Sequence, residues 1–229
     1  MVDPGDADVV ESALRQHGLQ LTAILVTHHH HDHIGGVAAL AREHRVEVFG
    51  PAGEDIPSLT RAVGDGDTIA LPELGLTLRV LGVPGHTATH IAYLGANCLF
   101  IGDTLFSAGC GRLLGGTAEQ LYRSLQRIAA LPPDTAVHCA HEYTLANLAF
   151  SQAVDAGNPD RDAWLAECRS LRAAGRPTLP TTIGRERRVN PFLRTDAPDI
   201  VAALARHTGT RQATPEAGFA ALRAWKDVF

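Results

Sequence analysis

A run of histidine and aspartate residues constrains this chain more than any other feature of its sequence. The run reads Thr-His-His-His-His-Asp-His-Ile-Gly-Gly from Thr27 onward, and it directly follows an apolar stretch that is typical of a buried strand. In a loop that leaves a strand, His28 and His30 project alike, whereas Asp32 and His33 lie on the next turn and can face a second site. Imidazole and carboxylate groups suit zinc, iron and manganese alike. The spacing H-x-H-x-D-H therefore predicts ligands for two neighbouring metal ions.

Three shorter motifs occur in a similar setting further along the chain. Each follows an apolar run that reads as a strand, and they contain His86 in Pro-Gly-His-Thr, Asp103 in Gly-Asp-Thr and His141 in His-Glu-Tyr-Thr. The ends of strands in α/β folds bring together side chains that are distant in sequence. Taken alone, each of these residues is more often a turn residue or a core histidine. Taken together, they would complete two metal sites.

The expected elements divide the chain into two parts. Up to about residue 142, short strands alternate with turns and helices, which indicates an α/β organisation. After Tyr143, helical signals predominate, and Asn158 and Thr214 each precede a proline and an acidic residue, as at a helix N-terminus. We interpret the proline- and arginine-rich stretch 175–194 as a long loop. The expected strands are 21–26, 46–49, 68–71, 76–83, 91–94, 98–101 and 135–140, and the expected helices of the first part are 36–44 and 117–130.

Composition limits the classes of function. No apolar run approaches the roughly 18 residues that span a bilayer, and residues 1–6 lack the features of a signal peptide, so we expect a cytoplasmic protein. The four cysteines form no C-x-x-C pair, and we interpret them as reduced thiols. The formal net charge of −5 disfavours nucleic-acid binding, including a nuclease activity. We expect a monomer with no nucleic-acid or membrane partner.

The four motifs and their order resemble the metallo-β-lactamase superfamily, and the glyoxalase II (hydroxyacylglutathione hydrolase) family in particular, over nearly the whole chain. The resemblance implies an αββα sandwich at residues 1–142 and a C-terminal helical substrate-binding domain at residues 143–229. It implies two divalent metal ions, zinc by expectation and iron or manganese as alternatives. The implied ligands are His28, His30, His86 and Asp103 for one ion, and Asp32, His33, Asp103 and His141 for the other.

The reaction implied by this family is hydrolysis of S-(2-hydroxyacyl)glutathione, such as S-D-lactoylglutathione, to glutathione and a 2-hydroxy acid such as D-lactate. It is the second step of methylglyoxal detoxification. Two metal ions lower the pKa of a shared water enough to give a bridging hydroxide at neutral pH, so no serine or cysteine nucleophile is needed. Asp103 would bridge the metals and Asp32 would orient the hydroxide, which makes both catalytic. Antibiotic-hydrolysing relatives carry a cysteine ligand where this chain has Asp103, which disfavours that activity.

Four residues are expected to bind the glutathione part of the substrate, which carries two carboxylates. Arg112 lies in a segment that resembles the family's cation-supplying segment, and Tyr143 matches a family tyrosine that contacts the peptide. Arg223 and Lys226 belong to an R-x-x-K-D segment like the one that closes family members, and their spacing puts them on one face of a helix. Lys226 is the only lysine of the chain, which favours a function for it. Leu114 replaces an aromatic residue found in some relatives.

Two other functions stay open. A mononuclear iron persulfide dioxygenase shares the first histidine motif and recognises glutathione, but it generally lacks the closing R-x-x-K-D segment. A non-catalytic, metal-stabilised scaffold would be expected to have lost some ligands, and all seven ligand positions are intact here.

Family members usually carry further strands before the Val-Asp-Pro-Gly segment that begins at Val2. Either the start of the chain is misassigned, or the first sheet has lost strands and has an exposed edge.

Overall fold

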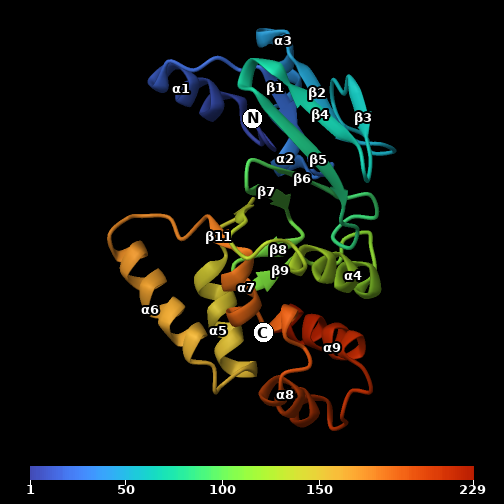
Figure 1. Cartoon of the computed structure of the whole chain (residues 1–229), viewed down its shortest axis with the longest axis vertical. Helices are drawn as coiled ribbons and strands as arrows, with labels where there is room; N and C mark the ends of the chain where they lie inside the picture. Colours follow the sequence, from blue (N-terminus) through green and yellow to red (C-terminus); the bar gives the residue numbers. More distant parts are fainter. The chain divides into compact units, whose positions relative to one another are not determined.

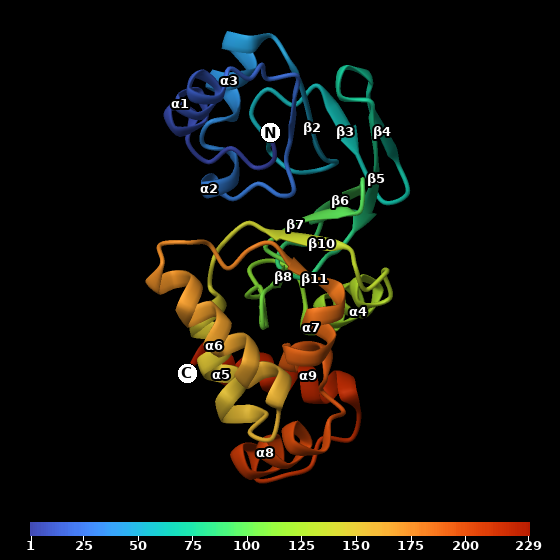
Figure 2. The same cartoon turned by 60° about the vertical axis from the view of Figure 1, so that its left-hand side comes forward.

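The computed structural model describes the whole chain, residues 1–229, which divides into two compact units. The first unit is Met1–Val83 with Thr89–Gly102, and the second is Pro84–Ala88 with Asp103–Phe229. Figure 1 labels most of the helices and strands, and Figure 2 adds the label of β10. The domain boundary expected at residue 142 stays a prediction, because compactness groups the residues from Asp103 onward with the tail.

A parallel sheet in the first unit is packed between two helices and a second sheet. Ile24 and Val48 share a buried cluster with Val10 and Leu40 of the helices, whereas Leu25 and its neighbours on the opposite face pack against the second sheet. This division follows from the alternation of side chains along a strand. The parallel strands are β1 (Ala23–Leu25), β2 (Glu47–Pro51) and β3 (Arg61–Val63), in that order. The covering helices are α1 (Ala7–His17) and α3 (Val37–His44).

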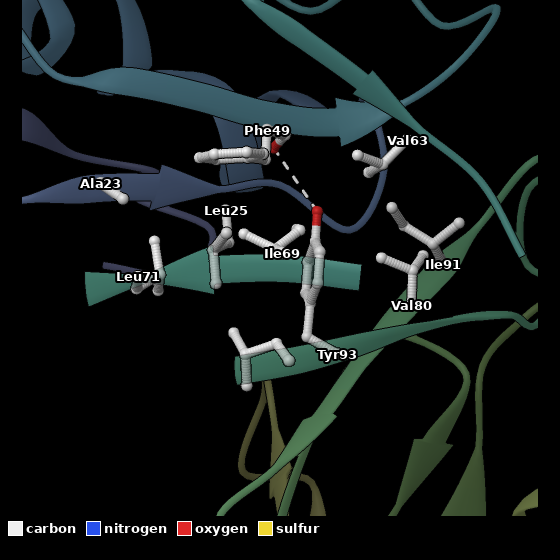
Figure 3. Packing of buried hydrophobic residues seen from close by; sticks show 10 residues of the cluster. Ala23, Leu25, Phe49, Val63, Ile69, Leu71, Val80, Ile91 and Tyr93 are labelled. Atoms are coloured by element: carbon white, nitrogen blue, oxygen red, sulfur yellow. Dashed lines mark hydrogen bonds between the residues drawn. The ribbon is translucent and has the colours of Figure 1, made fainter. Parts of the chain in front are cut away.

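The second sheet of this unit is antiparallel, and one tyrosine ties it to the first. Its strands are β4 (Thr68–Leu71), β5 (Leu76–Gly82), β6 (Ile91–Gly95) and β7 (Cys98–Gly102), with the 3-10 helix η1 (Pro72–Leu74) between the first two. Figure 3 shows Tyr93 of β6 pointing through the apolar cluster toward Phe49 of β2. Its hydroxyl lies 2.6 Å from the carbonyl oxygen of Val26 and 3.4 Å from that of Phe49. Burial raises the pKa of Tyr93, so the hydroxyl stays protonated and donates.

The first three residues lie along the outer side of β1. Val2 forms a parallel bridge with Leu25, and the backbone amide of Leu25 donates to the carbonyl of Met1 at 2.9 Å. The amide of Asp3 in turn donates to the carbonyl of Leu25 at 2.9 Å. One side of β1 is therefore paired with Met1–Asp3, and this pairing places Asp3 beside the end of β1.

The second unit combines two small antiparallel pairs with helices. The pairs are β8 (Leu105–Phe106) with β9 (Gly109–Cys110), and β10 (Ala136–Cys139) with β11 (Thr181–Thr182). The helices are α4 (Ala118–Ala129), α5 (Thr144–Val154), α6 (Pro159–Ala173), α7 (Ile183–Val189), η2 (Pro191–Leu193), α8 (Pro198–Thr208) and α9 (Pro215–Asp227). In both views α5 lies beside α6 and α8 beside α9 (Figures 1 and 2). Figure 1 shows the C-terminus following α9.

Most of the expected elements are confirmed. Both predicted helix caps form their hydrogen bonds. The side-chain amide oxygen of Asn158 accepts a hydrogen bond from the backbone amide of Arg161, and the hydroxyl of Thr214 accepts one from the backbone amide of Ala217. Four strands begin at the predicted residues, Thr68, Leu76, Ile91 and Cys98. None of the helices has the combination of length and apolar character that would let it cross a bilayer.

The interpretation of residues 175–194 as a loop is wrong. This stretch contains β11, α7 and η2. Thr182 caps α7 through the amide of Arg185, and the fully buried carboxylate of Glu186 accepts from Thr181 and from the amide of Ala108. A helix this short has little stability of its own, so these tertiary contacts form it and local sequence signals do not reveal it.

Candidate metal centre

The predicted ligands of the first unit lie in the loop after β1 and on the short helix α2 (His31–Ile34). His28 Nε2 lies 3.0 Å from His30 Nδ1, and His33 Nε2 lies 3.8 Å from Asp32 Oδ2. His28 and His33 are buried, whereas the side chain of Asp32 is exposed. The structure therefore brings these four residues together as the two pairs that the spacing predicts.

Asp3 is a candidate functional residue that the sequence analysis did not identify. Its carboxylate accepts from the amide of Thr27 at 2.7 Å, from the Thr27 hydroxyl at 2.7 Å and from His33 Nδ1 at 3.0 Å. Because a carboxylate only accepts, Nδ1 of His33 carries the proton and Nε2 keeps its lone pair. Asp3 would thus orient His33 to offer Nε2 to a metal, as carboxylates commonly do for ligating histidines.

The same carboxylate fixes the tautomer of His28 through Thr27. The hydroxyl of Thr27 has one hydrogen, which it donates to Asp3, so it accepts from His28 Nδ1 across 3.0 Å. Nε2 of His28 then carries the lone pair and is the candidate ligand atom. Two ligands therefore depend on one carboxylate, which sits 24 and 30 residues away in the sequence from Thr27 and His33.

Asp103 lies between two histidines in the second unit. Its Oδ2 is 3.6 Å from His86 Nε2, and its Oδ1 is 3.5 Å from His141 Nε2. Two ligands bound at about 2.0–2.2 Å to one tetrahedral ion lie roughly 3.3–3.6 Å apart. These separations therefore fit a carboxylate that shares one cation with each histidine. His86 Nδ1 donates to the carbonyl of Arg112 at 2.8 Å, which again leaves Nε2 as the ligand atom.

Local backbone geometry explains how these residues reach the ends of strands. His86 follows β5, Asp103 follows β7 directly, and His141 follows β10. Gly102 has a φ of +52°, and a Cβ atom there would lie 2.4 Å from the Thr27 hydroxyl, so only glycine suits the turn that leads to Asp103. These three candidate ligands thus lie just after strands, as the sequence motifs predict.

Aromatic rings pack against His141. Tyr143 stacks on its imidazole with centroids 5.1 Å apart and an interplanar angle of 18°. Phe106 is buried and lies edge-on to Tyr143, with centroids also 5.1 Å apart. Tyr143 itself is 50% exposed, so it can contact a substrate with its outer face while it packs on a ligand with the other.

The predicted cations occupy different environments. The side chain of Arg112 is exposed, with Nε 4.0 Å from the carboxylate of Asp227. Arg223 is buried, and Nη2 lies 3.0 Å from the same carboxylate. Lys226 is half-buried, with Nζ 5.1 Å from the ring of Phe150. Burial lowers the pKa of Lys226, and the neighbouring charges of Arg223 and Arg112 lower it further. Leu114 is exposed.

Cys110 of β9 is expected to resist alkylation in the folded protein. Burial raises the pKa of its thiol to about 11, and the thiolate is the reactive form. We expect iodoacetamide at about pH 8 to leave Cys110 unmodified until the chain is denatured, as mass spectrometry of the peptide would show. Cys98, which is partly exposed, is the internal control. Equal modification rates of Cys110 in the folded and denatured states would contradict its placement.

Two protein families match this chain and together cover its whole length. The family described as the metallo-beta-lactamase superfamily matches residues 1–141, and the one described as hydroxyacylglutathione hydrolase C-terminus matches residues 142–229. The hydroxyacylglutathione hydrolase of Chromohalobacter salexigens is 53% identical over 232 residues, which cover 100% of this chain and 89% of that protein. The chain belongs to the hydroxyacylglutathione hydrolase family of the metallo-β-lactamase superfamily. The resemblance stated from the motifs is confirmed.

Solved structures support the same fold. ETHE1 from Myxococcus xanthus is 26% identical, with a TM-score of 0.61 over 96% of this chain and 83% of that one. TTHA1623, solved in a di-iron-bound form, is 28% identical, with a TM-score of 0.59 over 83% of this chain and 87% of that one. The expected metallo-β-lactamase fold with a helical C-terminal region is confirmed. Membership of the superfamily implies that the chain binds divalent metal, and its histidine and aspartate groups are the candidate ligands.

Proposed function

We propose that this chain hydrolyses the thioester of S-(2-hydroxyacyl)glutathione, S-D-lactoylglutathione above all, to glutathione and the 2-hydroxy acid. The observation that carries the proposal is the family match along the whole chain, including the C-terminal region that is specific to hydroxyacylglutathione hydrolases. The hydroxy acid from that substrate is D-lactate, so the reaction would complete methylglyoxal detoxification. We further propose that the chain acts in the cytoplasm, as a monomer and without nucleic-acid or membrane partners.

Two divalent ions, zinc in our proposal and iron or manganese as alternatives, would be held by seven side chains. The first ion would take His28, His30, His86 and Asp103, and the second Asp32, His33, Asp103 and His141. The spacing of Asp103 from His86 and from His141, and the Nε2 tautomers of three histidines, support this assignment. Bound there, the ions would supply water activation and polarisation of the thioester carbonyl.

Side chains of the protein would orient the attacking water and bind the substrate. Asp32, exposed beside His33, would orient the attacking water and accept its proton. The departing thiol has a reference pKa near ~8.5, so it leaves as thiolate without needing a general acid from the chain. Tyr143 would contact the peptide beside His141, while Arg112, Arg223 and Lys226 supply the positive charge that faces the substrate carboxylates.

Substitution of Lys226 by methionine should weaken substrate binding with little effect on turnover. The change keeps an apolar stem against Phe150 and removes the ammonium group. A hydrogen bond to a charged group contributes about 1.5–3 kcal/mol, so we expect KM for S-D-lactoylglutathione to rise about 10- to 100-fold at nearly constant kcat. Steady-state kinetics measure both. Arg206→Met, on the exposed surface of α8, is the charge-matched control, and an unchanged KM in Lys226→Met would leave Lys226 without its assigned role.

The proposal as a whole is tested by assaying purified protein with S-D-lactoylglutathione while its metal content is measured. Hydrolysis that disappears on treatment with a chelator and returns with added zinc, iron or manganese is the expected result. Consumption of oxygen with glutathione persulfide, without thioester hydrolysis, would instead identify a persulfide dioxygenase. Full metal occupancy without either activity would indicate a scaffold.

A further inference from the structure

Both terminal nitrogens of Arg223 in α9 donate hydrogen bonds inside the protein, whereas its buried Nε has no partner. The residue is 4% exposed, and its Nη1 donates to the carbonyl of Cys110 at 3.0 Å and lies 3.5 Å from that of Gly111. Nη2 donates to Asp227 at 3.0 Å, and the guanidinium lies over the ring of Phe192 at 5.3 Å. A planar guanidinium with several donors suits such a set of acceptors, and a lysine cannot reproduce it. These contacts therefore fix the position of the Arg223 guanidinium.

The segment that Arg223 holds leads directly to a candidate metal ligand. The carbonyl of Arg112, next after Cys110 and Gly111, accepts from His86 Nδ1 at 2.8 Å. This hydrogen bond leaves Nε2 of His86 with its lone pair, 3.6 Å from Asp103 Oδ2. A chain of contacts therefore runs from the C-terminal helix through three consecutive backbone carbonyls to the imidazole.

Close packing makes this segment a rigid connection. The amide of Gly111 donates to the carbonyl of Thr104 at 3.2 Å. A Cβ atom on Gly111 would lie 1.9 Å from the carbonyl oxygen of Asp103 and 3.3 Å from His86 Nδ1. Nothing larger than glycine fits between these groups, so a displacement of residues 110–112 changes the position of both candidate ligands.

We infer that Arg223 is a positioning residue: by holding the carbonyls of Cys110 and Gly111, it keeps the Arg112 carbonyl on His86 Nδ1 and so fixes the tautomer and orientation of His86. The inference rests on the proposed metal function and deepens it. It gives the R-x-x-K-D segment a second role, because Arg223 then supports the metal centre in addition to the charge that it and Lys226 provide for the substrate. The C-terminal helix would therefore contribute to metal binding as well as to glutathione recognition.

Single variants on the last two helices test this second role. Arg223→Met keeps the length of the side chain and removes every donor, Arg223→Lys keeps only the charge, and Lys226→Met and Arg206→Met are the comparisons. The readouts are metal affinity from competition with a chelator, the visible spectrum of the cobalt-substituted protein, and kcat and KM with S-D-lactoylglutathione. Loss of a group that orients a metal-bound histidine costs about 10- to 100-fold in metal affinity or activity.

We expect Arg223→Met to lose metal affinity within that range and to change the cobalt spectrum. It should also lower kcat more than it raises KM. Arg223→Lys should show a smaller change in all of these quantities. Lys226→Met should raise KM with wild-type metal affinity and spectrum, and Arg206→Met should alter none of them. If Arg223→Met does not fold, Asp227→Asn loosens the same guanidinium and should lower metal affinity to a smaller extent.

The results that would overturn the inference differ from those that would overturn the proposed function. An Arg223→Met protein, or in its place Asp227→Asn, with wild-type metal affinity and cobalt spectrum contradicts the positioning role, even if KM rises. The hydrolase assignment then stands, because the wild-type protein still binds metal and cleaves the thioester. A wild-type protein that holds no metal and cleaves no thioester contradicts the proposed function instead.

Discussion

Substitution of Asp103 by alanine is expected to abolish thioester hydrolysis and to lower the metal content of the protein. The two oxygens of this carboxylate lie 3.6 and 3.5 Å from the Nε2 atoms of His86 and His141, so its removal takes a ligand from both proposed ions. Loss of a group that only orients a ligand costs about 10- to 100-fold. We therefore expect a loss of kcat/KM on the order of a thousandfold or more, well beyond that range.

Two further variants keep this experiment interpretable. Asp103→Asn retains the shape of the side chain but not its charge, and it should also lose activity and metal, because a neutral amide is a poorer ligand. Asp196→Ala removes an exposed carboxylate from the same unit and should match the wild type. Metal analysis, circular dichroism and kinetics on the same samples separate unfolding from loss of ligands. A folded Asp103→Ala protein with wild-type metal content and activity would refute the bridging role.

Substitution of Asp3 by alanine should have the second largest effect, although Asp3 is not proposed to bind metal. The change removes the acceptor for His33 Nδ1 and for the Thr27 hydroxyl, so both His33 and His28 lose their fixed tautomers. We expect metal affinity to fall about 10- to 100-fold and kcat/KM to fall with it, while excess metal restores part of the activity.

Asp8→Ala is the matched control for Asp3→Ala. Asp8 is an exposed carboxylate in the first turn of α1, and its removal should cost only a few tenths of a kcal/mol in stability, roughly the contribution of an exposed charge near a helix end. Chelator competition and activity at saturating metal measure the difference between the two variants. If Asp3→Ala bound metal as tightly as Asp8→Ala, the hydrogen bonds of Asp3 would serve stability alone.

The sequence predicted the features that depend on residues close together in the chain. The H-x-H-x-D-H run pairs His28 with His30 and Asp32 with His33 because residue spacing over one strand end and one helical turn fixes which side chains are neighbours. Helix caps such as Asn158 were predictable for the same reason, since a cap and the amide that it satisfies lie within one turn. The family match supports the fold but not the individual site residues, which remain predictions.

The features that could not be predicted depend on contacts between distant residues. Asp3 gave no local signal, because its partners lie 24 and 30 residues away, although its place in Val-Asp-Pro-Gly was visible. Helix α7 is formed around the buried Glu186, whose partner Ala108 is 78 residues away. The R-x-x-K-D pattern likewise treated Arg223 and Lys226 as equivalent cations, whereas burial separates the two.

One measurement decides whether this chain is a metal-dependent thioester hydrolase: the rate of S-D-lactoylglutathione hydrolysis together with the number of metal ions per chain, on one sample of purified protein. We expect rapid hydrolysis with two divalent ions bound, and for Asp103→Ala no hydrolysis and a lower metal content. Metal-replete protein that leaves the thioester intact would contradict the proposed hydrolase function.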